Sequence, residues 1–238
     1  MKEITHDQQR RIWEEEHKNP YVLPQMDSGQ MSSGVEKLTD WLTKKGEKRR
    51  LRGIELGCGK GRNVIGLAKL GFEMTGIDFS VSAIKEARRR AEKAGIGNKA
   101  HFSVHDATLI WPFDSDSFDL AIDCFATTDI ESEKGRKFAA IEMAKVLRPG
   151  GYLLAYLLSP DDEFHKETMK VSPAAERNAF LHPTTGKFEK MFDRNEILSL
   201  YSQLQLIEEQ RIEKTATFFG QEYNCNHFWM IFQKKSND

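Results

Sequence analysis

Short apolar runs alternate with amphipathic helical patterns through the middle of this 238-residue chain. Five of the runs have the length and the aliphatic and aromatic content of β-strands. They lie at about 50–56, 72–78, 100–105, 118–124 and 152–158. The last run is apolar at nearly every position, which is typical of a strand buried on both faces. Strands that alternate with helices predict an α/β fold with a parallel sheet covered by helices.

The helical periodicity predicts two of the intervening helices in detail. Ser80 is placed to cap a helix that runs to Ala94, with Gly95 as its stop. A second helix should run from Glu133 to Leu147. The side chains expected to face the sheet are Val81, Ile84, Ala87, Ala91 and Ala94 in the first helix and Phe138, Ile141 and Ala144 in the second.

Residues 159–192 break this rhythm. They are polar, contain three prolines and have no clear period, so we expect irregular structure there. Asp193 and Glu196 then have the spacing of a capping box at the start of a helix. The other elements predicted outside the central region are helices at 5–18 and about 35–45, a loop at 19–34, and strands near 204–213 and 226–233.

A glycine-rich turn joins the first strand to the helix that follows it. Gly57, Gly59 and Gly61 alternate there with Cys58 and Lys60. Glycine allows a close approach that a Cβ would block, so a ligand can lie directly on this turn, near the free N–H groups of the helix start. We expect Cys58 and Lys60 to contribute backbone groups rather than side-chain chemistry.

The spacing of these glycines separates two kinds of nucleotide site. A dinucleotide site has the pattern G-x-G-x-x-G, but here the third glycine comes one residue early and Arg62 stands where a glycine is expected. The carboxylate of Glu55 would repel a pyrophosphate and suits a cationic group, such as the α-ammonium of an amino acid. Asn63 is placed to assist at the helix start. A nicotinamide-dependent oxidoreductase and a turn without a ligand are the alternatives.

The pattern acid-x-G-x-G-x-G at 55–61 resembles the first motif of the class I S-adenosylmethionine-dependent methyltransferases. The turn at 148–151 is also similar to the one that precedes the fifth strand in that family. The resemblance implies a doubly wound, mostly parallel seven-stranded sheet with helices on both faces and an antiparallel last strand. It also implies S-adenosylmethionine as the cofactor. The residues around the turn resemble small-molecule methyltransferases, including the tellurite-resistance and thiopurine types.

We therefore expect a single methyltransferase domain over residues 1–238. Its predicted parts are an N-terminal helical cap at 1–49, a cofactor-binding half at 50–158, an insertion at 159–192 that forms a substrate lid, and a C-terminal helix with two strands at 193–238.

Acidic residues follow the ends of the predicted strands, where open parallel sheets bind ligands. The two carboxylate oxygens of Asp78 match the two hydroxyls of a ribose, and Phe79 beside it either lies against the adenine or belongs to the core. By the resemblance, Asp106 and Ala107 contact the adenine, unless Asp106 only starts a turn. By the same resemblance, Asp123 borders the methionine end of the cofactor, with a structural hydrogen bond as the alternative.

Methyl transfer from a sulfonium mainly requires that the acceptor be aligned, so we expect no fixed catalytic constellation. The acceptor pocket is expected to use residues 1–34, 125–130 and 159–192. Trp13 and Tyr21 are candidates to close over the cofactor. The candidate proton acceptors are His165, His182, His227 and Tyr223.

The composition of the chain limits the kinds of partner and cofactor that we expect. A net charge of −1 argues against binding nucleic acid mainly by electrostatics and favours a small-molecule acceptor. No apolar stretch approaches the roughly 18 residues of a membrane span, and the N-terminus lacks a signal-peptide core. The three cysteines imply no disulfide framework, and Cys225 and His227 alone do not make a metal site. We expect a cytoplasmic enzyme without a metal; a non-enzymatic S-adenosylmethionine-binding protein is a further alternative.

Overall fold

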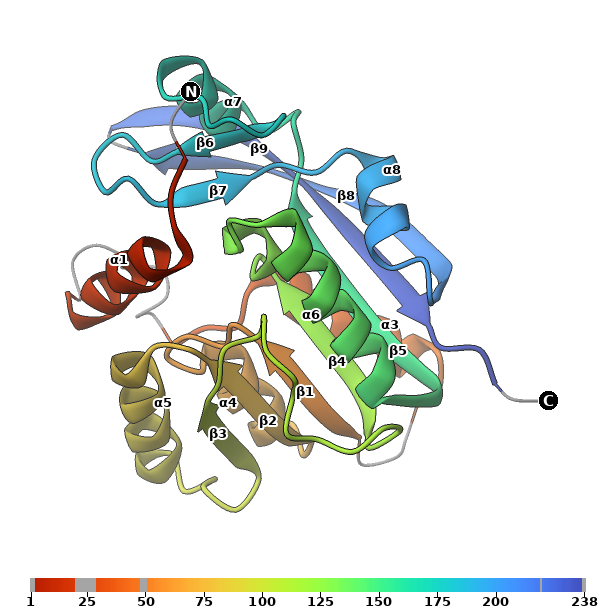
Figure 1. The fold of residues 1–238 in the computed structure, drawn as a ribbon. Coiled ribbons are helices and arrows are strands. Elements are labelled where there is room, and N and C mark those ends of the chain that lie inside the picture. Colours follow the sequence, from red (N-terminus) through yellow and green to blue (C-terminus); the bar gives the residue numbers. More distant parts are fainter. Residues whose placement is uncertain (1–2, 20–28, 48–50, 219, 237–238) are drawn as a thin grey trace.

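Seven strands form the main sheet of the protein. The computed structural model describes residues 3–19, 29–47, 51–218 and 220–236. The strands are β1 Arg52–Leu56, β2 Glu73–Asp78, β3 Ala100–Val104, β4 Phe118–Cys124, β5 Leu147–Leu158, β8 Gln205–Phe218 and β9 Gln221–Gln233. Their order is β3-β2-β1-β4-β5-β9-β8 (Figure 1). The first five are parallel, and β9 runs antiparallel between β5 and β8. The predicted sheet with an antiparallel last strand is confirmed.

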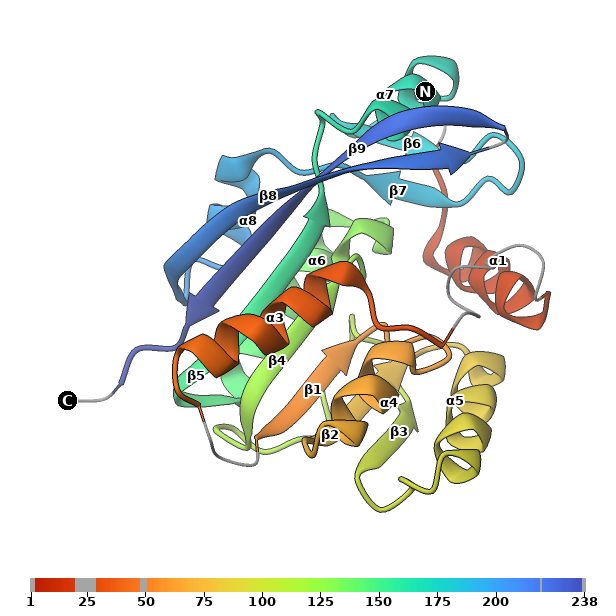
Figure 2. The same ribbon diagram turned by 180° about the vertical axis from the view of Figure 1, so that it is seen from behind.

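Helices cover both faces of this sheet. They are α3 Ser33–Lys44, α4 Arg62–Lys69, α5 Val81–Lys93, α6 Glu133–Val146 and α8 Arg194–Leu200. Helix α1 His6–Lys18 packs against α5 instead. The apolar sides of α3, α4 and α5 form one core with one face of the sheet (Figure 2). Helices α6 and α8 form a second core with the opposite face (Figure 1). Because β1 to β4 are parallel, their carboxyl ends meet at one edge of the sheet, which leaves that edge for a ligand.

Start signals in the sequence predicted the helix boundaries well. The Ser80 hydroxyl accepts a hydrogen bond from the backbone N–H of Ala83 and caps α5. The backbone N–H of Asp193 donates to the Glu196 carboxylate at 2.8 Å, as a capping box at the start of α8 requires. These signals act over three residues, which is why they can be recognised without the tertiary structure.

The sheet-facing stripes of α5 and α6 differ in part from the predictions. Val81 and Ala94 are exposed because they lie at the two ends of α5, and Val81 is 61% exposed. In α6, Ile141 is 47% exposed and Phe138 is half-buried. The α6 residues that join the core are Ala139, Ala140, Met143, Ala144 and Val146, of which only Ala144 was predicted to do so. The small alanine side chains on this face let α6 lie close to the sheet. The prediction gave more weight to the larger apolar residues, Phe138 and Ile141, which lie on the other side of the helix.

Two regions contain more regular structure than the sequence predicts. The segment 159–192, expected to be irregular, holds helix α7 Glu163–Val171 and an antiparallel pair of strands, β6 Ala179–Leu181 and β7 Phe188–Lys190. Strands of three residues are too short to produce a detectable period. The last two strands also extend beyond their predicted bounds, because the far halves of β8 and β9 pair only with each other, past the end of β5.

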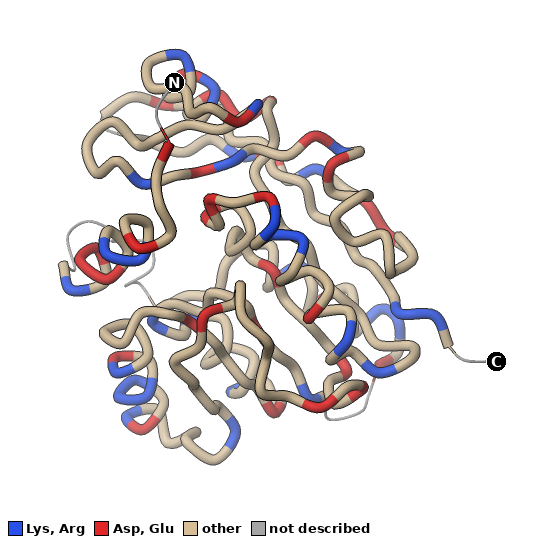
Figure 3. The backbone as a smooth tube through the Cα atoms, in the orientation of Figure 1, with Lys and Arg blue, Asp and Glu red and all other residues tan. Residues whose placement is uncertain are grey.

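No helix in the described ranges is long and apolar enough to cross a membrane. Helices α1, α5 and α6 each carry residues of both charge signs (Figure 3), in keeping with a net charge near zero.

Candidate functional site

The glycine turn between β1 and α4 leaves no room for side chains. Gly57, Gly59 and Gly61 all have positive φ, at 60°, 52° and 79°, which L-residues with a Cβ rarely adopt. A Cβ on Gly57 would lie 2.7 Å from the Cβ of Ala126, and one on Gly61 would lie 2.8 Å from the Phe102 ring. The turn is therefore closely packed on its protein side while its outer side faces a cavity.

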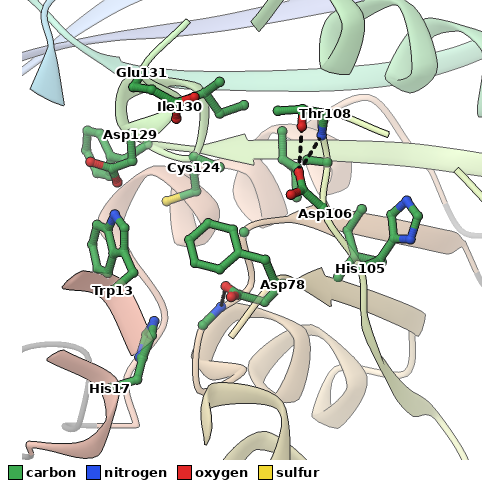
Figure 4. A pocket seen from close by; sticks show the side chains of 18 of the residues that line it. Trp13, His17, Asp78, His105, Asp106, Thr108, Cys124, Asp129, Ile130 and Glu131 are labelled. Atoms are coloured by element: carbon green, nitrogen blue, oxygen red, sulfur yellow. Dashed lines mark hydrogen bonds between the residues drawn. The ribbon is translucent and has the colours of Figure 1, made fainter. Parts of the chain in front are cut away.

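That cavity lies over the carboxyl ends of the central strands (Figure 4). The predicted site residues that line it are Gly57, Gly59, Asp78, Phe79, Asp106 and Ala107. The predicted residues outside its lining are Glu55, Cys58, Gly61, Asn63 and Asp123. The lining also includes side chains that the sequence did not single out for the cofactor: His6, His17, Arg62, His105, Thr108, Cys124, Asp129 and Glu131.

Asp78 is held in place by the backbone around it. Its Oδ2 accepts from the N–H of Gly59 at 2.9 Å, and its Oδ1 accepts from the N–H of Ser80 at 2.8 Å. Burial raises the pKa of this carboxyl to about 6, although both backbone hydrogen bonds lower it. Each oxygen keeps a further lone pair, so the side chain has acceptors available for two hydroxyl groups.

Glu55 lies beneath the turn and is paired with Asn63. The amide of Asn63 donates to Glu55 Oε1 at 2.6 Å and accepts from the backbone N–H of Ser32 at 2.8 Å. The other oxygen of Glu55, Oε2, is buried without a hydrogen-bond partner in the described part of the chain. Burial raises the pKa of Glu55 to about 8. The pair joins β1, α4 and the segment before α3 behind the cavity.

Asp106 is bound by the N-terminal helix, which the sequence did not suggest. His6 of α1 contacts Asp106 Oδ2 through Nε2 at 2.6 Å and Glu131 Oε1 through Nδ1 at 3.0 Å. Asp106 Oδ1 accepts from the backbone N–H and the hydroxyl of Thr108 (Figure 4). Burial raises the pKa of Asp106, but the His6 and Thr108 hydrogen bonds outweigh it and lower the pKa overall.

Two of the predicted site residues have structural roles. Asp123 is fully buried, and its oxygens accept from the backbone and hydroxyl of Thr127 and from the Tyr201 hydroxyl at 2.6 Å. This is the structural hydrogen bonding given as the alternative for Asp123. The backbone N–H of Cys58 donates to the Ile77 carbonyl at 3.0 Å, and its carbonyl accepts from the N–H of Gly61 at 2.9 Å. Burial also raises the pKa of the Cys58 thiol well above its usual value.

A second cavity adjoins the first. Trp13, Arg62, Phe125 and Asp129 line both cavities, which makes these four side chains the boundary between them. Two of the candidate proton acceptors, His165 and His227, line the second cavity, whereas His182 and Tyr223 line a separate surface depression. The other side chains around the second cavity include Ser33, Tyr156, Lys187, Glu189, Lys214 and Phe218. Tyr21 lies outside the described residues.

Helix α1 closes one side of both cavities, and its contacts are polar. Gln9 exchanges hydrogen bonds with the backbone of Phe188 and donates to the carbonyl of Asp129. Glu14 accepts from two serines of the α5 N-terminus, Ser80 and Ser82. Glu16 pairs with Lys187 at 3.2 Å. Trp13 and His17 project from this helix toward the first cavity (Figure 4).

The sheet order and a ligand cavity over a glycine turn define a Rossmann-like, nucleotide-binding α/β protein. Comparison with known proteins shows which family of such proteins the chain resembles. Residues 54–151 match the family described as methyltransferase domain. The methyltransferase GfsG of Streptomyces halstedii is 34% identical over 101 residues, which make up 42% of this chain and 35% of that protein. The chain spans less than half the length of the curated relatives that it matches.

Comparison with solved structures also finds methyltransferases, and it covers more of the chain. A SAM-dependent methyltransferase from Methanosarcina mazei is 25% identical, with a TM-score of 0.71, over 82% of this chain and 98% of the other. The 1,6-didemethyltoxoflavin-N1-methyltransferase of Burkholderia thailandensis, with 1,6-didemethyltoxoflavin and S-adenosylhomocysteine bound, has the same fold, with a TM-score of 0.68 at 13% identity over 99% of this chain and 93% of that one. Over residues 54–151 the chain is therefore similar to the methyltransferase family, and its fold is similar to that of solved methyltransferases that use S-adenosylmethionine.

Proposed function

We propose that the protein transfers a methyl group from S-adenosylmethionine to a small-molecule acceptor bound in the second cavity. The observation that carries this proposal is the boundary between the two cavities, formed by Trp13, Arg62, Phe125 and Asp129. A cofactor on the glycine turn and an acceptor in the second cavity would meet there. Alignment of two bound reactants is the main contribution that a methyltransferase makes to the rate.

The first cavity has the donors and acceptors that S-adenosylmethionine requires. We assign Asp78 to the ribose hydroxyls, Gly57 and Gly59 to the close approach of the cofactor, and Asp106 with Ala107 to the adenine. Trp13 Nε1 and His105 Nε2 are buried on the cavity wall without hydrogen-bond partners in the described part of the chain. Such atoms are costly unless a ligand or water satisfies them, and a polar nucleoside is suited to do so.

Two carboxyl groups suit the positive charge of this cofactor, which carries its transferable methyl on a sulfonium. Asp129 lies on the boundary of the two cavities. Burial raises its pKa well above the usual value, and the charge of Glu189 raises it further. A bound cation favours the ionised form of such a carboxyl. Glu55, whose Oε2 has no partner in the described chain, is assigned to the same electrostatic role from beneath the turn.

We assign the acceptor side to the parts of the chain outside the sheet. The N-terminal cap at 1–49 contributes Trp13, and the insertion at 159–192 contributes His165, Lys187 and Glu189 to the second cavity. Charged and aromatic side chains on one wall suit a small polar or aromatic acceptor. The insertion would act as a substrate lid, and β7 already exchanges hydrogen bonds with α1.

The test begins with the cofactor and then turns to the acceptor. Calorimetry should show binding of S-adenosylmethionine and S-adenosylhomocysteine, with no comparable binding of NADH. A panel of thiol, amine and hydroxyl compounds is then screened for release of S-adenosylhomocysteine. Turnover with at least one acceptor supports the proposal. Preference for NADH would favour the oxidoreductase, and tight cofactor binding without turnover across the panel would favour a binding protein.

A further inference from the structure

Three potential metal ligands lie together beside the second cavity, and two of them, Cys225 and His227, line it. Cys225 and His227 are two positions apart on β9, so their side chains project to the same side of the strand. Asp162, the N-cap residue of α7, faces them, and α7 lies beside β9 (Figure 1). One ligand atom of each residue lies within 4.8 Å of the other two. Cys225 and His227 are adjacent enough to be recognised in the sequence, whereas the fold brings Asp162 to them from 63 or more positions away.

The cluster is buried and has the dimensions of a metal site. Residue exposure is 0% for Asp162, 2% for Cys225 and 6% for His227. Asp162 Oδ2 lies 3.4 Å from His227 Nε2. Two ligands at adjacent corners of a tetrahedral zinc site, each about 2.1 Å from the metal, lie about 3.4 Å apart. These two atoms can therefore both bind one ion without a large displacement.

Neighbouring side chains already orient two of the three ligands. Tyr156 Oη lies 2.9 Å from His227 Nδ1, which leaves Nε2 directed at the cluster. His165 Nδ1 lies 2.6 Å from Asp162 Oδ1. Asp162 Oδ2, the oxygen on the cluster side, accepts from the backbone N–H of Asn226 at 3.0 Å and keeps a further lone pair for an ion. Hydrogen bonds of this kind fix the tautomer and orientation of ligands in metal sites and contribute to their affinity.

We propose that Asp162, Cys225 and His227 bind one Zn²⁺ ion. Thiolate, imidazole and carboxylate together suit zinc among the common divalent metals. The ion replaces the thiol proton of Cys225 and the Nε2 proton of His227, when present, and these protons go to solvent. Cys225 and His227 line the second cavity, so the fourth coordination position opens into that cavity. This proposal departs from the expectation of no metal and does not depend on the proposed methyl transfer.

The experiment uses the full-length protein stripped of metal with a chelator. Zn²⁺ is titrated in by calorimetry, and Co²⁺ is used as a spectroscopic probe, with metal content measured by mass spectrometry. We expect one ion per chain and, with Co²⁺, a thiolate-to-cobalt charge-transfer band together with the visible bands of a tetrahedral site. Absence of stoichiometric binding of either ion by the folded wild-type protein would overturn the proposal.

Variants distinguish this site from a metal bound elsewhere on the surface. Cys225→Ser should remove the charge-transfer band and lower zinc affinity at least 100-fold, and His227→Asn should lower it similarly. Tyr156→Phe should lower it by about 10- to 100-fold, because it removes only the partner that orients His227. The matched controls, Cys124→Ser and the exposed His101→Asn, should bind zinc as wild type does.

Circular dichroism of each stripped variant checks that it is folded. If Cys225→Ser fails to fold, the wild-type stoichiometry and the Tyr156→Phe affinity still decide the question. Equal zinc affinity in wild type and in folded Cys225→Ser and His227→Asn proteins would show that the three residues are only a hydrogen-bond network.

Discussion

At the scale of single residues, similar carboxylates at the strand ends have different roles. Asp78 lies on the cavity wall with free lone pairs, whereas Asp123 is enclosed by Thr127 and Tyr201. Both are aspartates near the carboxyl end of a parallel strand, so strand position alone does not separate them. Their roles differ because Asp123 has hydrogen-bond partners from other elements, Thr127 and Tyr201. Substitution of each aspartate should therefore have a different effect.

Asp78→Ala should lower S-adenosylmethionine affinity by about 10- to 100-fold, because charged hydrogen bonds contribute roughly 1.5–3 kcal/mol. Wild-type affinity should also fall below pH 6, since the pKa of Asp78 is raised to about 6 and the ligand-binding form is ionised. Calorimetry at several pH values measures both effects. Asp114→Ala, an exposed control, should bind normally, and wild-type affinity in Asp78→Ala would remove Asp78 from the site.

Asp123→Ala should lower the free energy of unfolding by about 3 kcal/mol, because it leaves buried donors of Thr127 and Tyr201 without an acceptor. Tyr201→Phe, which removes one of these hydrogen bonds, should cost about 1 kcal/mol. Urea denaturation gives both values. Cofactor affinity should stay within about twofold of wild type in folded protein. A large loss of cofactor affinity in Asp123→Ala, with an unchanged free energy of unfolding, would show instead that Asp123 belongs to the cofactor site.

At the scale of elements, α1 differs in how it is attached from the helices that pack in the two cores. Its buried residues are Gln9, Glu16 and His17, and hydrogen bonds and ion pairs join it to four other parts of the chain. A helix with little buried apolar surface opens at low free energy. We therefore infer that α1 is the element that moves to admit the cofactor, while the helices packed in the two cores stay in place.

Docking of α1 should weaken as the pH rises above neutral. Burial lowers the pKa of His6, but the hydrogen bond to Asp106 and the charges of Asp106 and Glu131 raise it overall above 6.5. Its contribution is therefore complete below pH 6.5 and is lost as the pH rises through the folded-state pKa. The lowered pKa of Asp106 gives a contribution that is present above its usual pKa of 3.8 and is lost in stronger acid. Docking should be firmest between these limits.

Hydrogen exchange of the α1 amides at pH 6 and pH 8.5, corrected for intrinsic rates, measures how firmly α1 is docked at each pH. Protection of α1 should decrease at the higher pH relative to that of α5. His6→Gln retains a hydrogen-bonding side chain without the titration, so its α1 protection should change little between the two values. A pH dependence that persists in His6→Gln would assign the effect to another group.

At the scale of the whole molecule, the two cores fix the sheet, and the first cavity lies over the carboxyl ends of its central strands. Binding to the folded state alone stabilises the protein by mass action, by about 2.7 kcal/mol at a ligand concentration 100 times Kd. For a chain of this size that is a rise in Tm of about 5–10 °C. Thermal denaturation with and without S-adenosylmethionine measures the shift.

The same concentration should raise the Tm of Asp78→Ala by half the wild-type rise or less, because it is then about 1 to 10 times the variant's Kd and stabilises by about 0.4–1.4 kcal/mol. S-adenosylhomocysteine should also stabilise the wild-type protein, since it retains the adenosine that Asp78 and Asp106 are assigned to bind. An equal rise in Tm for wild type and Asp78→Ala would place the ligand away from the glycine turn.

The sequence by itself determined the alternation of strands and helices, the caps at Ser80 and Asp193, and the glycine turn with Gly57 and Gly59. Each of these depends on periodicity or backbone conformation over a few residues, so the chain carries the signal locally. Only the tertiary structure decided the rest. His6 meets Asp106 across 100 positions, and Asp162 meets Cys225 and His227 because α7 packs beside β9. Contacts between distant segments depend on how whole elements pack, and no local pattern specifies them.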